Sequence, residues 1–165
     1  MTPDYFRLFA RYNHWANTRL YDACAQLSDA DRRRDRKAFF GSIHNTLNHL
    51  LVGDRVWMGR FTGTDSGIRK LNEILFDDFA ALRQARQAED DRIQAYVEGC
   101  GEAKLAGMLD FKSMNGTASS MPLASVLGHF FNHQTHHRGQ VHAMLTHAGA
   151  AAPSLDLIAF LREKR

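Results

Sequence analysis

The chain has 165 residues, which suits one domain over 1–165, and its hydrophobic and charged fractions, 44% and 24%, are ordinary for a globular protein. It contains no run of about 18 apolar residues and no signal-peptide pattern, so we expect a cytoplasmic protein that spans no membrane. Part of the net charge of +3 lies in DRRRDRK at 31–37, where two aspartates dilute the basic run, so a nucleic acid partner is not expected.

A first helix is predicted to begin at Pro3 and to end near residue 27. Thr2 is a favoured N-cap residue, and proline is favoured at the first helical position. Asp4 suits the positive end of the helix dipole. The apolar residues that follow recur at helical spacing, which predicts one buried face.

Two further long helices are predicted between residues 42 and 98. One covers about 42–61 and is ended by TGTDSG at 62–67. The next covers about 77–98, where two closely spaced glycines follow. Its middle, RQARQAEDDR at 83–92, is so polar that we expect it to face solvent.

The segment LDFKSMNGTASSMP at 109–122 does not have helical spacing. Asn115-Gly116 is a signal for a type I′ turn, so a small hairpin or an extended loop is predicted. Pro122 then opens a fourth long helix as its first residue, and this helix ends near Ala148.

A short last helix is expected over about 155–163. Four long amphipathic helices joined in this way predict an all-α fold, a four-helix bundle with a short hairpin or extended loop before the fourth helix. In such a bundle, ligand sites are most easily built between facing helices.

The fourth helix is unusually rich in histidine. HFFNHQTHHRGQVH, at 129–142, holds five of the nine histidines of the chain. On a helical wheel His137 falls inside the apolar arc and His133 lies at its edge, one turn away, whereas His129 and His136 lie farther out. Residues four apart stack on one face, so His133 and His137 can direct two imidazoles to one point in the bundle.

Two neutral imidazoles are good ligands for zinc, nickel, copper or iron(II), but a metal site needs at least a third protein ligand. Gln134 follows His133, so this is not the His-Glu-x-x-His site of a metalloprotease. Nor is there a Glu-x-x-His motif of the kind that builds a di-iron bundle. The alternative is a helix with one buried histidine and several exposed ones.

The second helix offers His44 and His49 as a third ligand. They lie on opposite shoulders of its apolar arc, and the wheel does not choose between them. Asp54 lies in the middle of the same arc, where a carboxylate needs a partner. It either orients a ligand histidine or pairs with an arginine, and the sequence leaves both open.

Three segments together resemble one protein family. YNHWANTRL, TLNHLLVGDRVW and NHQTHHRGQV are similar, in order and spacing, to the DinB family of small bacterial proteins. The resemblance covers nearly the whole chain and implies a four-helix bundle, often a homodimer, with a three-histidine metal site. Carried over residue by residue, the metal ligands would be His49, His133 and His137. Zinc or nickel is usual in such sites, and water would complete the coordination.

The resemblance also implies two alternative functions. Some relatives use the metal to activate a low-molecular-weight thiol, which makes this chain a candidate metal-dependent transferase with a small-molecule substrate. The alternative is a non-enzymatic metal-binding protein of the stress or DNA-damage response. No general base is apparent beside the predicted ligands, Asp54 being only a candidate, so the catalytic residues are unknown and the sequence leaves open whether the protein is an enzyme.

Overall fold

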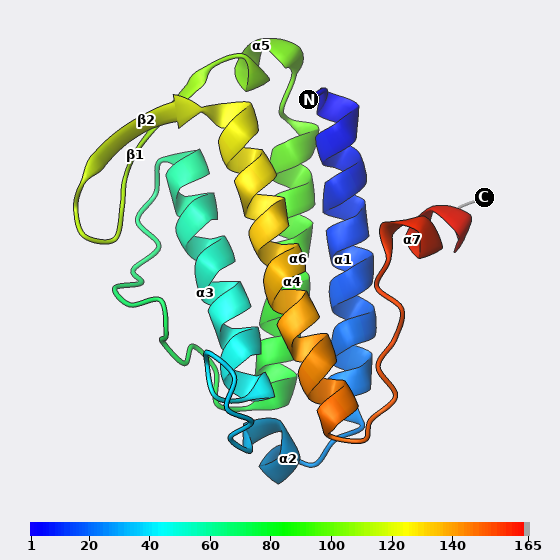
Figure 1. Ribbon diagram of the computed structural model, residues 1–165. Coiled ribbons are helices and arrows are strands. Elements are labelled where there is room, and N and C mark those ends of the chain that lie inside the picture. Colours follow the sequence, from blue (N-terminus) through cyan, green and yellow to red (C-terminus); the bar gives the residue numbers. More distant parts are fainter. Residues whose placement is uncertain (164–165) are drawn as a thin grey trace.

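The computed structural model describes residues 1–163 and is built from four long helices that lie side by side (Figure 1). These helices are α1 (Pro3–Ala25), α3 (Ile43–Thr62), α4 (Phe79–Glu98) and α6 (Leu123–His147). The α1 helix packs against α4 and α6, and α3 packs against the same two helices. The predicted four-helix bundle is therefore confirmed, and its predicted helix ends lie within two residues of the observed ones.

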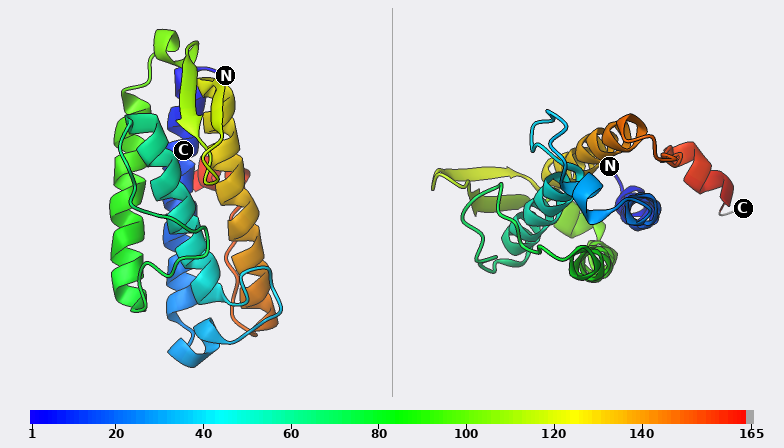
Figure 2. Two further views of the ribbon diagram at one scale, coloured as in Figure 1. Left: turned by 90° about the vertical axis from the view of Figure 1, so that its left-hand side faces the viewer. Right: turned by 90° about the horizontal axis from the view of Figure 1, so that it is seen from below.

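Shorter elements connect or flank the bundle. They are α2 (Asp29–Arg33), α5 (Glu102–Leu105), β1 (Met108–Lys112), β2 (Ala118–Pro122) and α7 (Leu157–Glu163). The two strands form an antiparallel hairpin that lies beside the C-terminal end of α3 (Figure 1). The α7 helix lies outside the bundle, next to α1 (Figure 2). Among residues 1–163, no helix is both long and apolar enough to cross a membrane.

Local sequence sets the helix ends. The side-chain oxygens of Thr2, Ser42 and Asp78 each accept a hydrogen bond from a backbone N–H in the first turn of α1, α3 and α4. These bonds satisfy donors that have no partner within the helix. Gly63 follows α3 with φ +70° and Gly149 follows α6 with φ +73°, a left-handed conformation that favours glycine.

The hairpin is confirmed, but two details of the sequence prediction are wrong. Of the two predicted turn residues, Asn115 and Gly116, only Gly116 has a positive φ, +87°, so the turn is not type I′, which needs positive φ at both. A five-residue loop is instead closed by the N–H of Ser113 donating to the carbonyl of Thr117, at 2.9 Å. Pro122 is not the first residue of α6: its ψ of 125° is extended, and it ends β2.

The polar middle of α4 faces solvent only in part. Gln84, Gln87, Asp91 and Arg92 are exposed, as predicted, but Arg86, Glu89 and Asp90 are buried. Arg86 forms ion pairs with Asp54 of α3 and with Asp90, the latter at 3.0 Å. Several buried polar side chains join them in what we call the buried charged network. Its members are Asn13, Asn17, Asp54, Arg86, Asp90 and Arg138.

This network lies between two apolar clusters that fill the two ends of the bundle. The cluster at the hairpin end includes Phe6, Met58 and Phe130, and the opposite cluster includes Leu20 and Leu47. A bundle packed in this way is apolar at both ends and charged in the middle. Three histidines, His49 of α3 and His133 and His137 of α6, lie on two of the helices that this network joins.

Candidate metal centre

Three histidines from two helices meet between α3 and α6. The Nε2 atom of His49 lies 3.3 Å from Nε2 of His133 and 3.2 Å from Nε2 of His137. One nitrogen from each ring falls within 4.8 Å of the other two. We call these residues the three-histidine cluster. The predicted one-turn stacking of the two α6 histidines is observed, and α3 supplies His49 rather than His44.

Hydrogen bonds at the far side of two rings fix which nitrogen carries the proton. Nδ1 of His49 lies 2.7 Å from the carbonyl oxygen of Leu71, and Nδ1 of His137 lies 2.8 Å from Oε1 of Gln140. Both oxygens only accept, so each Nδ1 must be the N–H donor and each Nε2 must carry a lone pair. Two lone pairs 3.2 Å apart repel each other unless a cation lies between them.

The spacing of these nitrogens fits a metal ion. Zinc binds imidazole nitrogen at about 2.0–2.1 Å, and tetrahedral ligands then lie about 3.3–3.4 Å apart. The two separations from His49, 3.2 Å and 3.3 Å, agree with that value, and all three ligand atoms lie within 4.8 Å of one another. The partner of each Nδ1 is also of the kind that commonly orients metal-binding histidines, a backbone carbonyl for His49 and a side-chain oxygen for His137.

Burial keeps the cluster neutral. Loss of solvent lowers the pKa of His49. It is also the main cause that lowers the pKa of His133 to about 3, with neighbouring histidines adding to the effect. Burial lowers the pKa of His137 to about 4, although the bond to Gln140 opposes the change. All three rings therefore keep their lone pairs at neutral pH, as metal binding requires.

The surroundings of the cluster are close-packed. The Phe40 ring stacks on His49 with centroids 3.9 Å apart and meets His137 edge-on at 5.6 Å. Gly53 of α3 faces His133, and a Cβ at this position would lie only 2.9 Å from Cε1 of that ring. Glycine is therefore needed here so that the imidazole can approach the α3 backbone.

Comparison with known proteins places the chain in a family. The sequence model described as "DinB family" matches residues 1–165. The chain belongs to the DinB family. Protein DinB of Bacillus subtilis (strain 168) is 27% identical over 158 residues, which cover 92% of this chain and 90% of that protein.

A solved structure of the same kind has a similar fold. The crystal structure of a DinB-like protein from Bacillus cereus ATCC 10987 superposes with a TM-score of 0.64, covering 88% of this chain and 94% of that one. At 18% sequence identity, this match concerns the fold alone. The all-α DinB-like architecture predicted from sequence is thereby confirmed.

Other residues singled out in the sequence lie outside the cluster. His44 is buried, and its ring contacts the side chain of Asn48. Asp54 pairs with Arg86, so the arginine alternative is the observed one. His129 and His136 are exposed, as the helical wheel indicates.

Sequence reasoning missed several residues that shape this DinB-family site. Gln140 lies one turn after His137, a spacing that would have suggested contact on a helix. Gly53 stands among apolar residues of α3 and carries a weak signal, because an isolated glycine in a helix often marks close packing. Phe40 and the carbonyl of Leu71 come from loops, and helical spacing gives no information about either.

Proposed function

We propose that the protein binds one divalent metal ion through Nε2 of His49, His133 and His137, with zinc or nickel as the preferred ions. The observation that carries this proposal is the pair of Nε2 lone pairs held 3.2 Å apart on His49 and His137. Their tautomers are fixed by Leu71 and Gln140, so a hydrogen bond between these two nitrogens is excluded. Imidazole nitrogen suits both metals.

We further propose that this DinB-family protein is a metal-dependent enzyme of the thiol-transferase type. A bound divalent metal with an open position supplies an acidified thiol or water as nucleophile at neutral pH. Three uncharged ligands, with no carboxylate joining the cluster within residues 1–163, leave the full positive charge available to an anionic thiolate. The chain itself holds the imidazoles in one tautomer through Leu71 and Gln140, and Phe40 shields one side of the cluster from water.

Metal content tests the first proposal. Protein purified without a histidine tag is analysed by mass spectrometry, as wild type and as His49→Ala, His133→Ala and His137→Ala. We expect about one equivalent of metal in the wild type and none in each variant. His129→Ala is the matched control, because this exposed histidine lies one turn from His133 and should leave the metal in place. A wild type that binds no metal after reconstitution would refute the proposal.

Turnover tests the second proposal. The metal-loaded wild type and the His133→Ala variant are incubated separately with a small thiol and an electrophilic acceptor. The loss of free thiol is measured over time in each sample. Turnover by the wild type alone supports a transferase. Metal binding without turnover for a panel of thiols would favour the alternative, a non-enzymatic stress or DNA-damage-response protein. The predicted homodimer is a separate proposal that sedimentation of the purified protein tests.

A further inference from the structure

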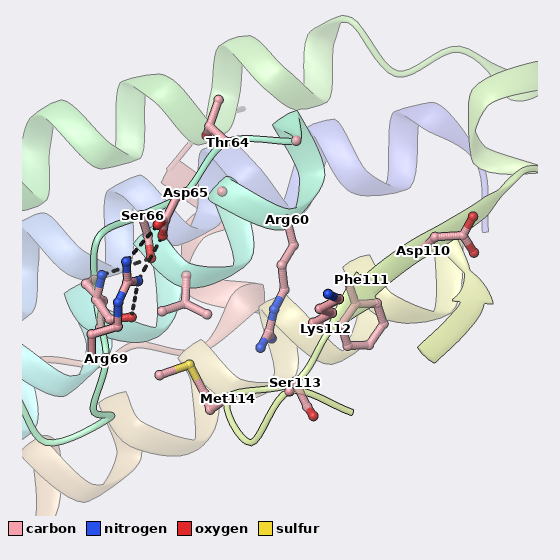
Figure 3. A pocket seen from close by; sticks show the side chains of 15 residues that line it. Arg60, Thr64, Asp65, Ser66, Arg69, Asp110, Phe111, Lys112, Ser113 and Met114 are labelled. Carbon is pink, nitrogen blue, oxygen red and sulfur yellow. Dashed lines mark hydrogen bonds and ion pairs between the residues drawn. The ribbon is translucent and has the colours of Figure 1, made fainter. Parts of the chain in front are cut away.

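A second site of interest lies at the hairpin end of the molecule. A cavity of about 550 Å³ lies between the C-terminal part of α3, the loop that follows it and β1 (Figure 3). Its apolar walls include Val56, Ile68, Phe111 and Met114. Its volume falls within the range of small-molecule binding pockets. We call this cavity the Arg60 pocket, after the charged residue that reaches into it.

Arg60 is a half-buried cation without a carboxylate partner among residues 1–163. Its guanidinium carbon lies 4.3 Å from the ring centroid of Trp57 and 5.1 Å from that of Phe111, so two rings hold it in place. Burial lowers the pKa of Arg60, and no ion pair within residues 1–163 offsets this loss of solvent. An anion entering the pocket would supply the missing compensation.

Other charged residues around the pocket differ from Arg60. Arg69 also lines it, but its guanidinium is turned to Asp65 and forms an ion pair at 2.7 Å (Figure 3). Lys112 of β1 is exposed, lines the pocket and has no ion-pair partner in the part of the chain that the structure describes. The carboxylate of Asp110 points away from Arg60 (Figure 3). Among the lining residues without an ion pair in the described part of the chain, Arg60 and Lys112 are positive and Asp110 is negative, so positive charge is in excess.

The pocket and the three-histidine cluster share one face of α3. Positions 49 and 60 are 11 residues apart, which brings their side chains to within about 20° of each other around the helix, with a rise of about 16 Å. A row of rings connects the two sites. The centroids of His133 and His129 lie 6.1 Å apart, and those of His129 and Trp57 lie 5.4 Å apart.

We propose that the Arg60 pocket binds the carboxylate or phosphate group of a small organic anion, with the apolar walls holding the body of that molecule. The anion is the far end of a substrate whose reacting end lies at the three-histidine cluster. Only this second statement rests on the proposed metal-dependent function, because the pocket contains no residue of the cluster.

Fluorescence of Trp57 reports on the pocket. The chain has two tryptophans, so Trp15→Phe leaves Trp57 as the single one, in contact with Arg60. This variant, metal-free, is titrated with benzoate, phenyl phosphate and the neutral analogue benzyl alcohol. We expect a saturable change with benzoate or phenyl phosphate and none with benzyl alcohol. The better of the two anions identifies the group that the pocket prefers.

Substitutions in this background separate the roles of the cations. A charged hydrogen bond contributes about 1.5–3 kcal/mol, so Arg60→Gln should weaken anion binding about tenfold or more. Lys112→Gln should weaken it less. The control Arg34→Gln should leave it within about threefold, because this exposed arginine pairs with Asp31 and does not line the pocket. Arg60→Lys keeps the charge and should retain part of the affinity.

Three results would overturn the inference: no saturable change with either anion, equal binding of benzyl alcohol, or an Arg60→Gln variant that binds as the parent does. Circular dichroism tests whether each variant is folded. If Arg60→Gln does not fold, the anion affinities of Arg60→Lys and Lys112→Gln test the inference in its place. Metal analysis of the same preparations is independent of this titration. Failure of the metal proposal and failure of the pocket proposal therefore give different results.

Discussion

Replacing Gly53 by alanine should separate metal binding from folding. A Cβ at this position would lie 2.9 Å from Cε1 of His133, whereas carbon atoms in good contact lie about 3.5–4.0 Å apart. The imidazole must therefore retreat by about 0.6 Å or more. Metal–ligand distances are held to about 0.2 Å, so this displacement takes His133 out of bonding range. Alanine is favoured over glycine within a helix by about 1 kcal/mol, which supports α3 itself.

We expect Gly53→Ala to remain folded and to bind metal at least 10–100-fold more weakly, the range found when an outer-shell partner of a ligand is lost. Affinity is measured by competition with a chromophoric chelator, and stability by urea unfolding of the metal-free protein. Gly139→Ala is the matched control, since this α6 glycine has no atom within 4 Å of an added Cβ. It should gain up to about 1 kcal/mol in stability and keep its metal affinity. A folded Gly53→Ala protein with wild-type metal affinity would refute the reasoning.

Three further predictions follow from the contacts. Gln140→Leu removes the acceptor that holds the His137 ring, so metal affinity should fall about 10–100-fold by chelator competition, and an unchanged affinity would contradict this role. Asp54→Ala leaves Arg86 buried without that partner and should cost about 3–5 kcal/mol in urea unfolding, whereas Arg83→Ala, which breaks a half-exposed pair, should cost less than about 1 kcal/mol. The metal-free protein should lose stability as the pH falls from 6.5 toward 4, because the two α6 histidines of the cluster have folded pKa values of about 3 and about 4, and the unfolded chain then binds more protons. Replacing both by alanine should flatten this decline in unfolding free energy, and an equally steep decline would show that other groups cause it.

The sequence predicts those parts of the molecule that depend on neighbours along the chain. Thr2, Ser42 and Gly63 act through backbone groups within a few residues, so the helix ends are predicted closely. His133 and His137 are also brought together by a single helix, since four residues make about one turn. The wheel cannot choose between His44 and His49, because that choice depends on which side of α3 faces α6.

Contacts between residues of different helices cannot be predicted from the spacing of residues within one helix. Arg86 lies in a stretch of α4 whose polarity predicts a solvent-facing position. It is buried because its partner Asp54 lies on another helix, α3. The helical wheel predicts that Asp54 needs a partner, but it does not identify that partner. The role of Gly53 depends on the ring of His133, which is 80 residues away in the sequence. Each of these residues acquires its role only when two helices are packed together.

The buried charged network explains how the helices that carry the cluster are held in register. Apolar side chains tolerate sliding of one helix along another, whereas ion pairs and hydrogen bonds do not. The network joins all four long helices: Asn13 and Asn17 of α1 donate to Asp90 of α4, and Arg86 of α4 pairs with Asp54 of α3. Arg138 of α6 donates to Asn13 and Asn17 and follows His137 directly in the chain.

A shift of α3 against α6 by one turn, about 5.4 Å, would separate the Nε2 atoms of His49 and His137, which are now 3.2 Å apart, and it would also break this network. We therefore expect the Asp54→Ala variant to lose metal affinity as well as stability, and full affinity in the folded variant would show that apolar packing alone sets the register.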